Sequence, residues 1–491
     1  MNISWGYSPK IEEYIPLGDL TIESYLSISE QIMVNLGWKL SHISNHELIA
    51  YTPMSLQSYG EEITCRFDGD FAIFRSECIG LQMLFNDYGK NAQNLTLFIR
   101  EFSYAKVQVN EASAPSDGFI AKQDTVKLGE SPLAAKANIK NVFSLLKPKE
   151  NYLGTSILIY LNVFYFLVYG LFMALFYRYL VSTKLLDPQN LGYYVGANSR
   201  ENVLNGEYWR LISHQFAHLS FFHLFFNMYA LAYIGLLVEH KLGLSKFLIT
   251  YLISGICGGI ISLLFHNFGY MTGASGAIMG LFGAFIALLI SRAFEPNASK
   301  ALLASTIVVL VLMLLSGAVK KNVDNAAHLG GLISGFISGY ILYHKKLLSP
   351  KLAYVTTISL TTLFAILVIC LTPKIQTREF EDLQKRYQKN WVTYHSIFQL
   401  PRNMPTGKKL TIIQERGIDV WKNSESLVKE MLALNLNDEQ RSKAEFHEKV
   451  VEIESKIVVL LYKECAESTN YYRREIRQLA GELNALRIRK R

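Results

Sequence analysis

The stretch Thr272-Gly273-Ala274-Ser275-Gly276-Ala277-Ile278-Met279-Gly280 opens a long apolar run, with one serine among small residues and no charge nearby. A second stretch, Asn325-Ala326-Ala327-His328-Leu329-Gly330-Gly331-Leu332-Ile333-Ser334-Gly335, opens another apolar run and carries a single imidazole. An ionisable side chain inside a membrane-spanning helix is costly and is usually paired or functional. Serine is a weak nucleophile that needs an adjacent base to accept its proton. We therefore predict that Ser275 is a nucleophile and His328 is its base.

The composition predicts a membrane protein with soluble parts. The chain has 491 residues, of which 50% are hydrophobic, and its mean hydropathy is positive, which is typical of several membrane spans in a multi-domain chain. Seven apolar runs recur, at 153–177, 218–238, 246–266, 275–291, 301–319, 326–343 and 353–372. We predict an all-α polytopic membrane domain in which each run is one span.

The chain divides into soluble flanks and this apolar middle. At the start, helical spacing at 22–36 and short strand-like runs at 63–67, 71–74 and 95–98 predict a small α+β domain. At the end, helical periodicity with mixed charge predicts an extramembrane helical region. The predicted parts are a soluble α+β accessory domain at 1–111, a linker at 112–150, a membrane domain with seven spans at 151–373 and a helical extramembrane domain at 374–491.

Charge and cysteine spacing argue against several classes of protein. The net charge of +8 is modest for this length and fits lysines beside a membrane. Since no basic-aromatic module is present, we expect no nucleic-acid partner. The five cysteines lie far apart without metal-ligand spacing, so we expect neither a disulfide framework nor a metal or other cofactor.

Lysine and arginine near the short loops predict the orientation of the spans. One side carries Lys147, Lys149, Lys241, Lys246, Arg292, Lys300, Lys345, Lys346 and Lys351. The positive-inside rule places this side in the cytosol, together with the N-terminus. With seven spans, the C-terminal region is then predicted on the outer side. The start of the chain lacks a basic segment followed by an apolar core, so we expect no cleavable signal peptide.

Alternating spans bring polar residues to one end of the membrane domain. The second, fourth and sixth spans run in the same direction, so each begins on the predicted outer side. The second span opens with His218, His223 and Asn227, and the last two share a helix face because they lie four residues apart. Topology therefore gathers these side chains, Ser275 and His328 at one depth.

Glycine spacing predicts that the fourth and sixth spans approach closely. Gly276 and Gly280 form one small-xxx-small pattern, and Gly331 and Gly335 form another. Such patterns let helix backbones come together in lipid. The first pattern adjoins the serine and the second begins one turn beyond the histidine, so close approach would bring hydroxyl to imidazole.

Four motifs, in their order and placement, resemble those of the rhomboid family of intramembrane serine proteases. They are Gly206-Glu207-Tyr208-Trp209-Arg210, His218-xxxx-His223-xxx-Asn227, Gly273-Ala274-Ser275-Gly276 and Ala327-His328-xx-Gly331-xxx-Gly335. The resemblance extends over about residues 152–373, and the last span resembles the seventh helix that follows a six-helix rhomboid core in some members. The resemblance does not cover the soluble flanks.

The resemblance implies an intramembrane serine endopeptidase that cleaves transmembrane proteins in or next to their membrane segments. Ser275 would attack the scissile carbonyl, and His328 would act as general base and acid without a third carboxylate. Its implied oxyanion donors are His223, Asn227 and the Ser275 backbone N–H. The implied supporting residues are His218, Gly273, Gly276, Gly331 and Gly335, and the implied structural loop motif is Trp209 and Arg210. This layout, without a transit peptide, favours a bacterial inner membrane.

Three other interpretations fit the sequence less well. A transporter or channel could use the histidines as a proton relay, but the sequence shows no inverted repeat and no acidic residue within the predicted spans. A metalloprotease would need the HExxH pattern, which is absent. A catalytically inactive relative that only binds membrane proteins would not need Ser275 and His328 together.

Overall fold

The computed structural model describes residues 9–55, 58–80, 86–111, 152–183, 191–266, 270–319, 323–344, 348–374, 376–401, 403–436 and 438–489. By internal contacts, residues 371–491 form a compact unit of their own, and the residues before them form another. The predicted linker at 112–150 lies outside the described residues. The predicted domain boundaries stay predictions.

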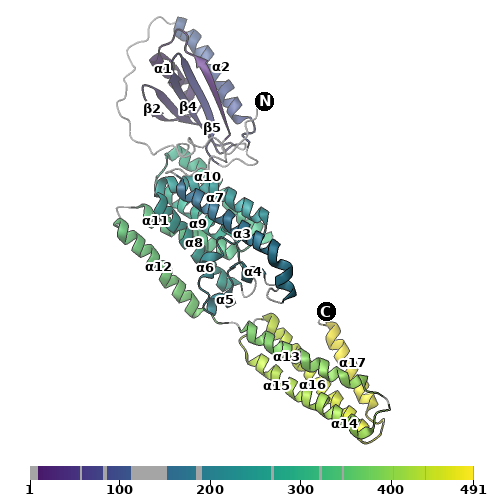
Figure 1. Cartoon of the computed structure of the whole chain (residues 1–491). Helices are drawn as coiled ribbons and strands as arrows, with labels where there is room; N and C mark the ends of the chain where they lie inside the picture. Colours follow the sequence, from purple (N-terminus) through teal and green to yellow (C-terminus); the bar gives the residue numbers. More distant parts are fainter. Residues whose placement is uncertain are drawn as a thin grey trace. The chain divides into compact units, whose positions relative to one another are not determined.

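The N-terminal part is an antiparallel sheet with two helices, which confirms the predicted α+β class (Figure 1). Its elements are β1 (Lys10–Pro16), α1 (Ile22–Asn35), β2 (Lys39–Ile43), β3 (Glu47–Tyr51), β4 (Glu61–Asp68), β5 (Phe71–Cys78) and α2 (Lys90–Glu111). The sheet order is β1-β5-β4-β3-β2. Tyr25 of α1 packs on Phe102 of α2, with ring centroids 4.3 Å apart.

One predicted strand is wrong, because residues 95–98 belong to α2. Phe98 and Phe102 are buried one helical turn apart, and Phe98 stacks on Phe74 of β5 with ring centroids 4.6 Å apart. A run of four residues fits a strand or one face of a helix equally well. Packing against the sheet selects the helix.

The membrane part follows the predicted apolar runs closely. Its long helices are α3 (Leu153–Ser182), α7 (Phe221–Leu242), α8 (Leu244–Phe265), α9 (Ser275–Ile290), α10 (Pro296–Val319), α11 (Asn325–Tyr343) and α12 (Pro350–Leu371). Among the described residues, six of these helices are long and apolar enough to cross a membrane, whereas α9 has 16 residues and is shorter. The count of seven spans therefore stays a prediction.

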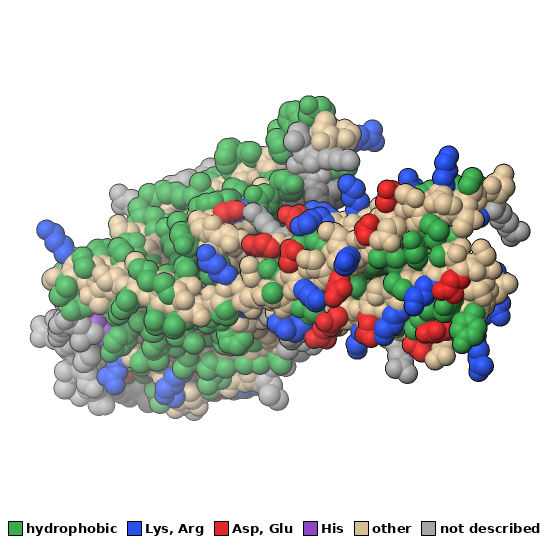
Figure 2. Space-filling model, turned by 90° about the horizontal axis from the view of Figure 1, so that it is seen from below, with side chains coloured by type: hydrophobic (Ala, Val, Ile, Leu, Met, Phe, Trp, Pro, Cys, Tyr) green, Lys and Arg blue, Asp and Glu red, His purple; other side chains and the backbone are tan. Residues whose placement is uncertain are grey.

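The short helix α9 lies at the centre of this part, against α7, α8 and α11. Most of its side chains are buried. In contrast, α3 and α12 expose many large hydrophobic side chains, such as Phe164 and Leu363. Figure 2 shows hydrophobic side chains covering one part of the surface with few charges, while charged side chains of both signs gather in another part.

The C-terminal unit is a helical bundle, as predicted from its periodicity. Its elements are α13 (Thr377–His395), η4 (Ser396–Gln399), α14 (Thr406–Ile413), η5 (Gln414–Ile418), α15 (Asp419–Ala433), α16 (Asp438–Ala466) and α17 (Arg473–Arg489). Trp421, Tyr394 and Met431 are fully buried at its core. The unit therefore has an apolar core of its own.

Candidate active site

The first turns of α9 and α11 bring Ser275 and His328 together. The Oγ of Ser275 lies 2.9 Å from the Nε2 of His328, although the two residues are 53 positions apart in the chain. Ser275 is the first residue of α9 and is half-buried, and His328 is 5% exposed. Among the described residues, the Nδ1 of His328 has no hydrogen-bond partner. The pair therefore has the geometry of a hydroxyl and its base, and no carboxylate of the described part of the chain is hydrogen-bonded to the imidazole.

Asp324 fixes the start of α11 just before the imidazole. It is the N-cap residue, and its Oδ1 accepts a hydrogen bond of 2.9 Å from the backbone N–H of Ala327. Its other carboxylate oxygen accepts a hydrogen bond from the hydroxyl of Ser262 in α8. An N-cap oxygen pairs one of the N–H groups that a helix start leaves without an intrahelical acceptor. The cap thus orients the turn that carries His328.

Glycines allow the two helices to meet at this depth. A Cβ at Gly331 would lie 2.0 Å from the carbonyl oxygen of Gly276, and a Cβ at Gly335 would lie 2.0 Å from that of Gly280. A Cβ at Gly276 would meet nothing nearer than 3.6 Å. The close approach predicted from the spacing is present, and it depends on the glycines of α11 more than on Gly276.

The start of α7 adds a polar cluster beside the serine. The Nδ1 of His218 lies 3.2 Å from the carbonyl oxygen of Phe216, and its Nε2 lies 2.9 Å from the Nδ2 of Asn227. The Ala274 backbone N–H also points at this Nε2, at 3.5 Å. An amide nitrogen can only donate, so Nε2 is the acceptor and Nδ1 carries the proton. His218 therefore holds Asn227 against the segment that leads into Ser275.

Gly273 makes room for the ring of His223. Its φ of +113° lies in a region that side chains rarely adopt, and a Cβ there would stand 2.5 Å from the Cε1 of His223. The rings of His223 and His218 are in edge contact, with centroids 5.0 Å apart. The structure thus brings His218, His223 and Asn227 to the residues directly before Ser275.

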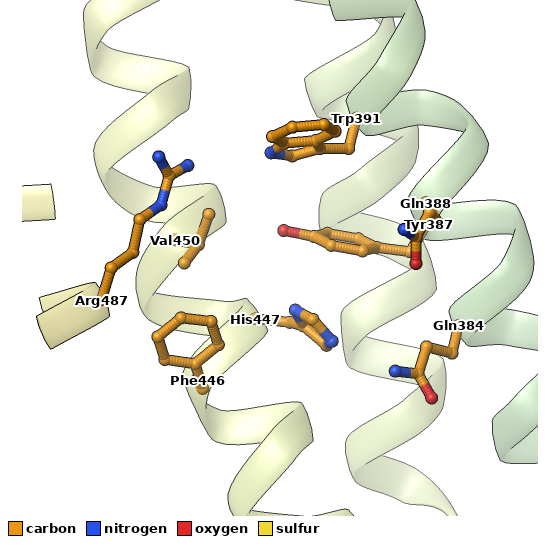
Figure 3. Close-up of a pocket in the computed structure, with 8 residues that line it drawn as sticks. All are labelled: Gln384, Tyr387, Gln388, Trp391, Phe446, His447, Val450 and Arg487. Atoms are coloured by element: carbon orange, nitrogen blue, oxygen red, sulfur yellow. The ribbon is translucent and has the colours of Figure 1, made fainter. Parts of the chain in front are cut away.

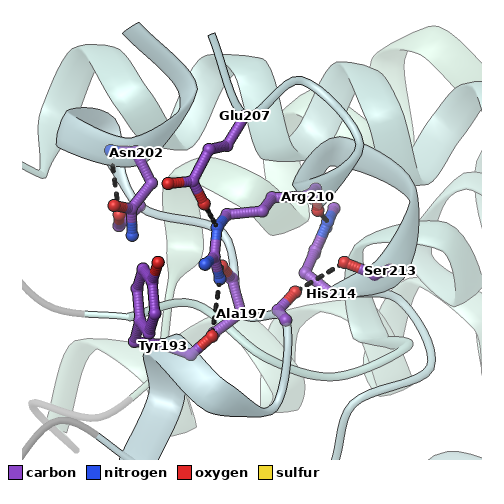
Figure 4. A network of polar contacts seen from close by, with 9 residues as sticks. Tyr193, Ala197, Asn202, Glu207, Arg210, Ser213 and His214 are labelled. Atoms are coloured by element: carbon purple, nitrogen blue, oxygen red, sulfur yellow. Dashed lines mark hydrogen bonds and ion pairs between the residues drawn. The ribbon is translucent and has the colours of Figure 1, made fainter. Parts of the chain in front are cut away.

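The first loop is held by a buried arginine (Figure 4). Arg210 is 1% exposed; its Nε donates to Glu207 at 2.6 Å, and its Nη1 donates to the carbonyl oxygens of Tyr193 at 2.9 Å and Ala197 at 3.0 Å. Its guanidinium also lies 4.5 Å from the ring centroid of Trp209. The loop contains α4 (Leu191–Tyr194), α5 (Arg200–Leu204) and α6 (Arg210–Ser213). Trp209 and Arg210 thus lie in a loop network and do not contact Ser275.

His214 is a buried residue of the site region that the sequence analysis did not single out. Its carbonyl accepts from the Gly273 N–H at 2.9 Å, and its ring Nδ1 lies 2.8 Å from the Arg210 carbonyl oxygen. Burial lowers the pKa of His214 to about 4, although the Arg210 carbonyl and Asp324 act in the opposite direction. The four-residue spacing of His214 and His218 is the one signal in the sequence that could have indicated it.

Comparison with known proteins gives consistent results. A model described as the Rhomboid domain matches residues 205–345. RHOMBOID-like protein 5 of Arabidopsis thaliana is 38% identical over 164 residues, which are 33% of this chain and 51% of that protein. Rhomboid protease GluP of Bacillus subtilis (strain 168) is 35% identical over 164 residues, 32% of each chain. The chain therefore spans only a third to a half of these two relatives.

A shorter relative is covered more fully. YdcA of Bacillus subtilis (strain 168), which also carries the rhomboid name, is 35% identical over 147 residues, and these are 29% of this chain but 72% of YdcA. With the six long apolar helices, the match describes a multi-pass integral membrane protein. Since one relative is matched over most of its length at this identity, the chain belongs to the rhomboid family.

Proposed function

We propose that this protein is an intramembrane serine endopeptidase that hydrolyses peptide bonds in or next to transmembrane segments of other proteins. The observation that carries the proposal is the 2.9 Å contact between the Ser275 hydroxyl and the His328 imidazole, at the starts of two helices in the apolar part of a rhomboid-family chain. Ionisable groups are rarely placed in such surroundings without a function.

The proposed reaction uses the two side chains in turn. The Nε2 of His328 accepts the Ser275 proton while Oγ forms a bond to the scissile carbonyl carbon. The imidazolium then gives this proton to the leaving amine nitrogen as the C–N bond breaks, which leaves an acyl-serine. A water molecule, deprotonated by the same Nε2, attacks the acyl carbon, and the imidazolium then returns the proton to Oγ as the acyl C–O bond breaks, which releases Ser275.

The oxyanion of each tetrahedral intermediate would be stabilised by donors beside Ser275. The backbone N–H of Ser275 belongs to the first residue of α9, where N–H groups lack intrahelical acceptors. The Asn227 amide nitrogen carries two N–H groups, and its contact with His218 uses one of them. His223 is a third candidate donor. Each such donor is commonly worth about 3 kcal/mol in the transition state.

The proposal includes the predicted orientation of the spans and the membrane in which the protein lies. Ser275, His328 and the start of α7 lie at the N-terminal ends of three helices. The lysine and arginine distribution supports an outer-side site with a cytosolic N-terminus. A bacterial inner membrane is the proposed location.

The test is cleavage of a single-span model substrate by the full-length protein in lipid nanodiscs, together with labelling by a fluorophosphonate probe. We expect both signals in the wild type, neither in Ser275→Ala and no cleavage in His328→Ala. Ser338→Ala is the matched control, because this buried serine of α11 donates to the carbonyl oxygen of Gly335 in its own helix. Full cleavage by Ser275→Ala would overturn the proposal. Binding of the substrate without cleavage by the wild type would instead identify an inactive relative.

A further inference from the structure

A cavity of about 220 Å³ lies between α13, α16 and α17 of the C-terminal unit (Figure 3). It is unrelated to the candidate active site, because all of its lining residues follow the membrane helices. Its lining includes Tyr387, Trp391, Phe446, His447 and Arg487. Two glutamines of α13 complete its rim, and none of the residues that line it is acidic.

The walls of the cavity are aromatic and held in place. Tyr387 is 5% exposed, and its ring packs on that of His447 with centroids 4.3 Å apart. Trp391 lies one turn further along α13, and Phe446 and Val450 of α16 also line the cavity (Figure 3). An apolar cavity of about 150 Å³ already holds a benzene molecule. This cavity therefore has room for one ring and a short polar group.

The polar groups around it are mostly donors. In Figure 3 the Arg487 guanidinium, the Tyr387 hydroxyl and the Trp391 indole nitrogen point toward the same space. Among the described residues the buried Tyr387 hydroxyl has no hydrogen-bond partner. Burial, and to a lesser extent Glu454, raises the pKa of Tyr387, so this hydroxyl keeps its proton at neutral pH.

The guanidinium of Arg487 has more N–H donors than its ion pair uses. Its Nη2 lies 3.2 Å from Oε1 of Glu454, whose side chain is 5% exposed, whereas the Arg487 side chain is 39% exposed. A guanidinium carries five N–H donors in a planar fork, and this contact uses one of them. The helix that carries it, α17, has five arginines and two glutamates. Within the lining, Arg487 supplies the positive charge that an anion would meet.

We infer that this cavity binds a carboxylate joined to an aromatic or branched apolar group. The carboxylate would pair with Arg487 and accept from the Tyr387 hydroxyl, which are charge-assisted hydrogen bonds. The apolar group would lie against the aromatic side chains that line the cavity. Two sources share this chemistry: a small aryl acid, and the C-terminal residue of a peptide.

The test uses the full-length protein and fluorine NMR of 3-(4-fluorophenyl)propionate, with its uncharged amide as the matched probe. For a ligand of this size we expect saturable binding with a dissociation constant of about 1 mM or lower, and at least tenfold weaker binding of the amide. A peptide that ends in Phe with a free carboxylate, compared with its amidated form, distinguishes the two sources. Tighter binding of the peptide indicates a chain end, and tighter binding of the small acid indicates a free ligand.

Three variants separate recognition from stability. Arg487→Gln removes the charge and should weaken binding of the acid about tenfold to a hundredfold. Tyr387→Phe keeps the ring and the packing, so it should leave the melting temperature unchanged and weaken binding several-fold. Arg477→Gln, an exposed arginine of the same helix, should bind as the wild type does. Absence of saturable binding up to about 10 mM, or equal binding of acid and amide by the wild type, would overturn the inference.

Discussion

Gly331 of α11 lies directly against the backbone carbonyl of Gly276 in α9, so that a Cβ at Gly331 would stand 2.0 Å from this oxygen. The contact is asymmetric, because a Cβ at Gly276 would find its nearest neighbour at 3.6 Å. The close approach of α9 and α11 near Ser275 therefore requires that Gly331 has no side chain.

The first prediction concerns this contact. Gly331→Ala should force α9 and α11 apart, because the obstacle is backbone and cannot rotate away. We expect a loss of about 1–3 kcal/mol of stability and a lower rate of substrate cleavage, measured by thermal unfolding and by the cleavage assay. Gly276→Ala is the matched control, since an ordinary van der Waals contact awaits its methyl group. An equal fall in melting temperature in both variants would contradict this account.

The second prediction concerns the cap of α11. Asp324→Ala removes the oxygen that accepts from the Ala327 N–H, whereas Asp324→Asn keeps an oxygen in the same place. Loss of an N-cap costs about 0.5–2 kcal/mol. We expect Asp324→Ala to lower the melting temperature and slow cleavage, and Asp324→Asn to retain most of both. The idea fails if the alanine variant cleaves at the wild-type rate.

The third prediction concerns the first loop. Arg210→Ala would leave the Glu207 carboxylate and two carbonyl oxygens without their donor, and a buried acceptor that loses its partner costs about 1–3 kcal/mol. Arg210→Lys keeps the charge but not the fork of N–H groups, so its melting temperature should lie between those of Arg210→Ala and the wild type. Arg178→Ala, at an exposed position of α3, serves as the control. Identical unfolding of all four proteins would refute the proposed role of the network.

Much of the arrangement could be predicted from the sequence, because membrane helices are limited by length and apolar character. The ends of α9 and α11 fall within a residue of the runs that contain Ser275 and His328. Parity of the spans then indicates that both residues lie at one end, and the 2.9 Å contact agrees with this. Their catalytic roles stay predictions, to be decided by the cleavage assay.

Other features depend on packing that a sequence does not display. Residues 95–98 form a helix and not a strand because Phe98 packs on Phe74, a residue 24 positions earlier. The burial of His214 likewise depends on distant residues. Its ring lies against Gly259 of α8, and a Cβ at Gly259 would stand 2.9 Å from the Cε1 of His214. A single histidine in a loop gives no sign of such a neighbour.

The burial of His214 leads to the fourth prediction, on pH dependence. Its pKa is about 4 in the folded protein, against 6.5 for an ordinary histidine, so the unfolded chain binds a proton at a pH where the folded chain does not. Its contribution to stability is complete above about pH 6.5 and is lost as the pH falls toward about 4, by up to about 3 kcal/mol. His214→Gln replaces the imidazole with an amide that can still donate to the Arg210 carbonyl but does not titrate. We therefore expect the melting temperature of the wild type to fall more steeply than that of His214→Gln between about pH 7 and pH 4.5; parallel curves would show that this histidine is not the group responsible.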